Sequence, residues 1–165
     1  MSKKSRLCII WHSRTGAVRA LVCAMVQAAR EYNVEALAIP AENAVAKDIL
    51  LADAVIFACP ENLALMSGAM KEFFDLNYYR LLGKVNGKSY ACVIAAGSDG
   101  TGAMRQIERI ATGLRLKKVA ASVLVITHSQ APETIYATKM LSDTQLAPAI
   151  ELARTLAAGL ELSIF

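Results

Sequence analysis

Short apolar runs and longer amphipathic stretches follow one another along the chain. Five runs rich in Val and Ile, each bounded by polar or Gly residues, predict buried strands. These runs span residues 6–11, 34–39, 54–59, 89–96 and 119–126. In the intervening stretches the apolar residues recur at helical spacing, which predicts helices. The helical stretches span residues 18–29, 45–50, 70–81, 104–114 and 146–160.

Strict alternation of strand and helix predicts an α/β fold. The interior strands are apolar almost without interruption, as a sheet covered on both faces requires. We therefore expect a five-stranded parallel sheet between two layers of helices, with right-handed crossovers. A chain of 165 residues, 55% of them hydrophobic, fits one domain over residues 1–165.

Composition and charge exclude several classes of function. The basic opening "MSKKSRLCIIWHSR" has too short an apolar run for a secretory signal, and every apolar run is too short for a membrane helix. We expect a cytoplasmic protein that binds no membrane. The net charge of +4 is dispersed along the chain, which argues against nucleic-acid binding. These exclusions favour a small-molecule site.

The four cysteines, Cys8, Cys23, Cys59 and Cys92, are far apart and lie in apolar surroundings. They form no C-x-x-C pair and have no clustered His, so we expect buried free thiols and no metal site. His12 and His128 each end a predicted strand, and we interpret both as structural residues. The sequence therefore assigns no catalytic side chain.

Three loops that follow predicted strands carry unusual polar residues: "HSRTGAV", "PENLALMSG" and "GSDGTG". In open parallel sheets, ligands bind outside the carboxyl ends of the strands, where the winding direction reverses. If the strand order is 2-1-3-4-5, all three loops line one cleft at that point.

The first of these loops, "SRTGAV", leads from a buried strand into a helix N-terminus. Free N–H groups and the helix dipole favour an anion there, and Gly16 lets the backbone close around it. Ser13 and Thr15 add hydroxyl donors. The alternative is an ordinary strand-to-helix turn with Thr15 as N-cap. The position of this loop beside two further polar loops favours the anion site over the ordinary turn.

The same three loops resemble those of a known superfamily. "SRTGAV" is similar to the phosphate loop of flavodoxin-like proteins, T/S-x-T-G-x-T/S, which wraps the FMN phosphate. "PENLALMSGAMKEFFD" resembles the second flavin loop and next helix of the NAD(P)H-dependent FMN and quinone reductases, P-x-x-x-G-x-M-S-G-x-x-K-x-F-x-D. "AAGSDGTGAMRQIERIATGLRL" resembles their third loop and fourth helix. The resemblance covers essentially the whole chain and implies a flavodoxin-like three-layer sandwich of strand order 2-1-3-4-5.

Carried over residue by residue, the resemblance implies a complete cofactor site. The phosphate would lie on Ser13, Arg14, Thr15, Gly16, Ala17 and Val18. The flavin ring would meet Pro60, Glu61, Asn62 and Leu63, and its pyrimidine edge would be flanked by Gly97, Ser98, Asp99 and Gly100. Backbone N–H groups of residues 97–102 would stabilise negative charge on the reduced ring.

Two departures from the family patterns bear on affinity. Val18 stands where the family usually has a third hydroxyl, and losing a hydrogen bond to a charged group costs about 1.5 to 3 kcal/mol. In the second loop, Ala64 replaces the usual Gly and no aromatic residue is present to stack on the ring. Both departures predict that FMN is held more loosely than usual.

The resemblance implies an oxidoreductase that passes hydride or electrons from NAD(P)H through FMN to a quinone, flavin or similar small acceptor. It also implies a homodimer or homotetramer, and "FFDLNYYRLL" offers more apolar surface than one core helix uses. Two alternatives stay open. One is a flavodoxin-type electron carrier, although such carriers are typically acidic and this chain has a pI near 8.9. The other is a flavodoxin-like scaffold that has lost tight FMN binding.

Overall fold

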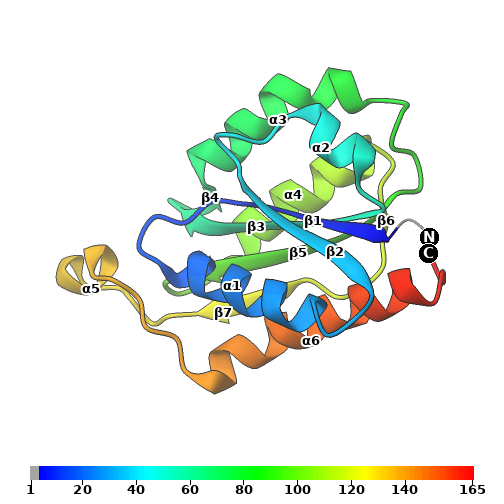
Figure 1. The fold of residues 1–165 in the computed structure, drawn as a ribbon. Helices are drawn as coiled ribbons and strands as arrows, with labels where there is room; N and C mark the ends of the chain where they lie inside the picture. Colours follow the sequence, from blue (N-terminus) through cyan, green and yellow to red (C-terminus); the bar gives the residue numbers. More distant parts are fainter. Residues whose placement is uncertain (1–3) are drawn as a thin grey trace.

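All five predicted strand positions belong to one parallel sheet. The computed structural model describes residues 4–165, so residues 1–3 of the basic opening lie outside the described residues. The strands are β1 (Ser5–Trp11), β2 (Val34–Pro40), β3 (Ala54–Asn62), β5 (Ser89–Ala96), β6 (Lys117–Lys118) and β7 (Val123–Ile126). Their order is β2-β1-β3-β5-β6, and β7 also pairs with β5 in parallel. The predicted order 2-1-3-4-5 is therefore confirmed (Figure 1).

The fifth strand is interrupted, so the prediction of a continuous strand over residues 119–126 is wrong. Tyr90 of β5 pairs with Lys118, and Val93 pairs with Val123, so residues 119–122 stand opposite only two residues of β5. The surplus residues leave the ladder as a bulge. Glu108, in the helix between β5 and β6, accepts hydrogen bonds from Lys118 Nζ (2.5 Å) and Ser122 Oγ (2.6 Å) on either side of the break.

The helices cover both faces of the sheet, as predicted. They are α1 (Ala17–Ala29), α2 (Ala46–Leu51), α3 (Gly68–Leu81), α4 (Thr101–Gly113) and α6 (Asp143–Glu161). Figure 1 shows α2, α3 and α4 on one side of the sheet and α1 and α6 on the other. Successive strand residues face opposite layers. Ile10 and Phe57 pack under α3, whereas Ile9 and Ile56 pack under α1 and α6.

No helix in the part of the chain that the structure describes is both long and apolar enough to cross a membrane.

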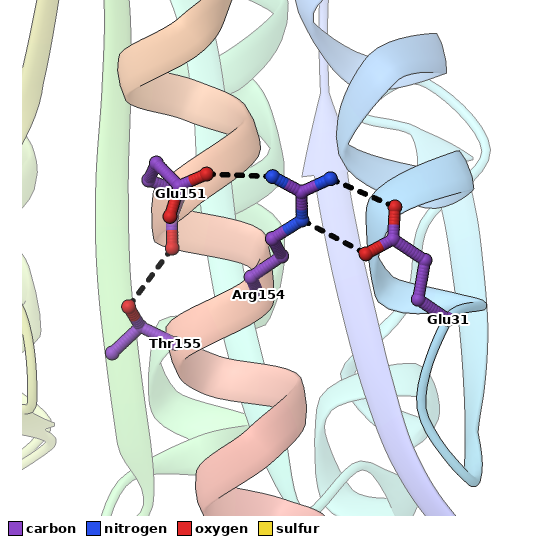
Figure 2. Close-up of polar contacts among 4 residues, drawn as sticks. All are labelled: Glu31, Glu151, Arg154 and Thr155. Carbon is purple, nitrogen blue, oxygen red and sulfur yellow. Dashed lines mark hydrogen bonds and ion pairs between the residues drawn. The ribbon is translucent and has the colours of Figure 1, made fainter.

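An arginine ties together the two helices of the second layer. Arg154 of α6 donates two hydrogen bonds of 2.9 Å to the carboxylate of Glu31, just after α1, and one of 2.7 Å to Glu151 (Figure 2). Bidentate pairing of this kind fixes geometry as well as charge. The hydrogen bonds from Arg154 hold the pKa of Glu31 below its ordinary value. This contact therefore supports the folded state above the unfolded pKa of Glu31, and its support is lost as the pH falls through the lowered folded pKa.

Two short elements were not predicted, and both lie near the carboxyl ends of the strands. β4 (Leu65–Met66) pairs antiparallel with the end of β3. α5 (Pro132–Tyr136) has no buried residue and projects from the layers (Figure 1). An element of two or five residues is too short to show a hydrophobic period, so the sequence pattern could not reveal either.

Candidate functional site

One cavity of about 550 Å³ opens at the carboxyl ends of β1, β3, β5 and β7. Its size lies within the range of small-molecule sites, roughly 300 to 1,000 Å³. All three polar loops singled out in the sequence contribute to its wall. The lining residues are Arg14, Thr15, Ala17, Pro60, Glu61, Asn62, Leu63, Ala64, Ala95, Ala96, Gly97, Ser98, Thr127, Ser129, Ile135, Tyr136 and Lys139.

Most of the predicted site residues meet at this cavity. Those that line it are Arg14, Thr15, Ala17, Pro60, Glu61, Asn62, Leu63, Gly97 and Ser98. The predicted residues that do not line it are Ser13, Gly16, Val18, Asp99 and Gly100. These five are near neighbours in sequence of lining residues, and their contact with a ligand stays a prediction.

The N-terminus of α1 is open toward the cavity. Its N-cap is Gly16, at φ 98°, and it has no side-chain cap, so the alternative of Thr15 as N-cap is wrong. Ser13 Oγ accepts the N–H of Gly16 at 3.2 Å, which closes the loop. Among residues 4–165, no protein group accepts the N–H groups of Ala17, Val18 and Arg19. Unpaired N–H groups at the positive end of a helix form an anion site.

Val18 contributes to the core rather than to the loop surface. Its side chain is 1% exposed and packs among the apolar residues beneath α1. A valine is suited to that position, whereas a hydroxyl there would need a partner. At this position the chain therefore has core packing in place of the hydroxyl that the family pattern has. The backbone N–H of Val18 has no acceptor among the described residues.

The second loop forms a β-hairpin. Glu61 pairs with Met66 and Asn62 with Leu65, which leaves Leu63 and Ala64 as the two turn residues. Their φ angles are 52° and 64°, so both lie in the left-handed region that two-residue type I′ turns require. Asn and Gly are the residues preferred there, and a non-Gly residue costs roughly 1 to 2 kcal/mol. The tip of the hairpin is thus strained, and the side chain of Leu63 is 98% exposed.

We expect Ala64→Gly to raise the free energy of unfolding by about 1 kcal/mol, because Gly adopts a positive φ without steric cost. Urea denaturation measures the change. The matched control is Ala158→Gly in the interior of α6, which should lower stability by about 1 kcal/mol. Destabilisation by both substitutions would contradict the strain assigned to the hairpin.

The carboxylate of Glu61 in the hairpin contacts the N-terminus of α4. Its carboxylate accepts the N–H of Gly100 at 2.8 Å and the N–H of Ala103 at 3.2 Å. Gly100 is the N-cap of α4 and Ala103 its third residue, so Glu61 caps that helix from a remote hairpin. In this structure a carboxylate of the chain already accepts the N–H of Gly100, and stabilisation of a ligand's charge by the N–H groups of residues 97–102 stays a prediction.

Residues after the fifth strand complete the cavity wall, and sequence reasoning missed them. Thr127 and Ser129 directly follow β7, a position that the strand order alone could have indicated. Tyr136 of α5 adds an aromatic side chain to the cavity wall, and it is 79% exposed. Lys139 anchors this segment to the first of the three polar loops, because its N–H donates to Thr15 O at 2.8 Å.

The cysteines play no part in the cavity wall. Cys8, Cys59 and Cys92 are buried, as predicted, but Cys23 on α1 is exposed, so the prediction that all four are buried is wrong for that residue. Desolvation raises the pKa of Cys8 to about 12 and that of Cys59 to about 11. The sequence placed Cys59 next to the second loop, but its thiol is protonated and shielded at neutral pH.

We expect Ellman's reagent at neutral pH to modify Cys23 rapidly in the folded protein and the other three thiols only on unfolding. Burial protects them sterically, and their raised pKa values deplete the reactive thiolate. Denaturant should release all four thiols, and Cys23→Ser should abolish the fast phase. Rapid reaction of a second thiol would contradict the burial described above.

The strand order and the cavity at the carboxyl ends of the strands define a flavodoxin-like α/β protein. The chain belongs to the NADPH-dependent FMN reductase family, whose model matches residues 19–131. That match includes the second and third loops and begins directly after the first.

Solved structures agree with this fold, and one curated relative matches part of the sequence. A flavodoxin from Aquifex aeolicus (strain VF5) is 29% identical over 98 residues, which are 59% of this chain and 53% of that protein, so the chain matches about half the length of this curated relative. A flavodoxin from the domain Archaea superposes with a TM-score of 0.75 at 16% identity, covering 94% of this chain and 98% of that one. The flavodoxin, WrbA-like protein from Agrobacterium tumefaciens gives 0.73 at 16% identity, covering 95% and 98%.

Proposed function

We propose that the protein binds FMN and passes hydride or electrons from NAD(P)H through it to a quinone, flavin or similar small acceptor. The observation that carries this proposal is the open N-terminus of α1 at a cavity of about 550 Å³. Free N–H groups there suit a phosphate. The other lining loops leave room beside it for a planar ring, and membership of the NADPH-dependent FMN reductase family supports both parts of the proposal.

The chain's own groups bind and orient rather than transfer protons. The N–H groups of Ala17, Val18 and Arg19 would hold the phosphate, with the exposed Arg14 as a nearby cation. The hairpin that begins at Pro60 and the loop that begins at Gly97 would form walls for the ring. FMN, when bound, supplies the hydride chemistry, so no acid–base pair among the side chains is required.

Two spectroscopic measurements test this proposal. The protein reconstituted with FMN should show the visible absorption of a bound flavin, and NADH or NADPH should bleach it in the absence of air. Dithionite provides the control for a flavin that can be reduced. A protein that binds no FMN would contradict the proposal and favour a scaffold that has lost tight binding. Bleaching by dithionite alone would contradict the reductase activity.

A flavodoxin-type electron carrier is the second candidate, because the curated relative from Aquifex aeolicus bears the name flavodoxin. Carriers of that kind exchange electrons with partner proteins and have no substrate site of their own. The pI near 8.9 opposes this candidate, because family carriers are typically acidic. Consumption of NAD(P)H with a quinone as acceptor distinguishes a reductase from a carrier.

We also propose that the protein assembles as a homodimer or homotetramer through the outer face of α3. Phe73 and Phe74 are buried within the subunit, but Leu76 and Tyr79 are 62% and 83% exposed. Exposed apolar side chains grouped on one helix are typical of a contact surface. Sedimentation at micromolar concentration should show an oligomer that Tyr79→Glu dissociates. A monomeric parent protein would contradict the proposal.

A further inference from the structure

The N-termini of α1 and α4, which follow two of the loops that line the cavity, differ in whether their N–H groups are paired. At α1 the first-turn N–H groups have no acceptor among the described residues, so the positive end of the helix dipole is open toward the cavity. At α4 the carboxylate of Glu61 accepts the N–H groups of Gly100 and Ala103. One end of the site is therefore left electropositive, whereas the other holds a negative charge of the chain itself.

Glu61 also fastens the hairpin to α4, together with two further contacts. Gln106 Oε1 accepts the N–H of Met66 at 2.8 Å. Gly102 lies so close to the hairpin that a Cβ there would stand 1.9 Å from Ala64 O. Glu61 is thus held in one place by the structure around it, and it lines the cavity at the same time.

We propose that Glu61 is a positioning residue whose charge lowers the reduction potential of the flavin bound beside it. This inference rests on the proposed function. A flavin that takes up two electrons and one proton gains one negative charge. A fixed carboxylate in the wall of the same cavity repels that charge, and by capping α4 it also removes the N–H groups that would otherwise stabilise it. The site thereby favours oxidised over reduced FMN.

The test compares Glu61→Gln, Glu61→Asp and the parent protein. Titration measures the Kd for oxidised and for reduced FMN, and redox titration measures the midpoint potential of the bound flavin. Glu61→Gln should tighten binding of reduced relative to oxidised FMN by about tenfold, which corresponds to a rise of about 30 mV for a two-electron couple. Glu61→Asp keeps the charge but is too short to retain both hydrogen bonds, so it should raise the potential by less than Glu61→Gln does.

The matched control is Glu72→Gln, the same chemical change at an exposed position of α3, which should alter neither Kd nor the potential. Amide hydrogen exchange of the protein without FMN reports the cap directly, and Gly100 and Ala103 should exchange faster in Glu61→Gln. A parent protein that binds no FMN would refute the proposed function. A parent that binds FMN, with an unchanged affinity ratio in Glu61→Gln, would refute this inference alone. An equal rise in potential for Glu61→Asp would also refute it.

Discussion

Thr15→Asp should yield a folded, colourless protein whose affinity for FMN is at least tenfold lower than that of the parent, a loss of about 1.4 kcal/mol or more. Thr15 lines the cavity beside the open N-terminus of α1. A carboxylate at this position repels a phosphate and competes for the free N–H groups of Ala17, Val18 and Arg19. An acidic residue near a helix N-terminus is itself favourable, so the fold should persist.

Fluorescence titration with FMN measures the affinity, and circular dichroism checks the fold. Thr144→Asp is the matched control, because it places the same residue in the first turn of α6, at an exposed position outside the cavity wall. It should bind FMN like the parent. Gly16→Asp is a less clean variant, since φ at this position is 98° and any side chain strains the turn. A folded Thr15→Asp protein that retains parental affinity would show that the phosphate lies elsewhere.

The fold was predictable because each layer has a long and regular pattern. Helices such as α1 and α3 bury one face, and strands such as β3 and β5 are buried on both, so their periods differ clearly. The prediction of a continuous fifth strand failed because apolar composition predicts burial but not register. Residues 119–122 are apolar enough for a strand, yet these four residues stand opposite only two residues of β5.

The location of the site was predictable, but the orientation of its side chains was not. Parallel strands bring the loops after β1, β3 and β5 to one edge whatever their sequence, and the cavity lies there. Glu61 belongs to the predicted loop, but its hydrogen bonds run to α4, some forty residues away. Such a contact depends on the hairpin, which in turn depends on the positive φ angles of Leu63 and Ala64.

The segment that contains α5 was missed for a different reason. Its five-residue helix buries no side chain, so no hydrophobic period marks it. Contacts made by Lys139 hold it instead, with the side chain donating to Thr134 O, Ile135 O and Ala137 O, and the backbone N–H donating to Thr15 O. Every residue has a backbone carbonyl that can accept a hydrogen bond, so the sequence does not indicate which of them Lys139 contacts.

Gly102→Ala should disrupt the same hairpin from the opposite side, lowering the free energy of unfolding by about 2 kcal/mol and the affinity for FMN by at least tenfold. Helix propensity alone predicts the opposite sign, because Ala is favoured over Gly in a helix by about 1 kcal/mol. Packing decides the outcome here, since the new Cβ would lie 1.9 Å from Ala64 O and 3.3 Å from Glu61 Oε2. The hairpin must move away from α4, which stretches the bonds from Gly100 and Ala103 to Glu61.

Gly68→Ala is the matched control for this substitution. Gly68 is the first residue of α3, just beyond the hairpin, and a Cβ there would meet nothing within 4 Å. It should leave FMN affinity unchanged and stabilise the protein by up to about 1 kcal/mol. Urea denaturation and FMN titration of both variants separate propensity from packing. If Gly102→Ala were as stable as Gly68→Ala and bound FMN equally well, the hairpin would not be held against α4, and the cavity wall described at Glu61 and Ala64 would be wrong.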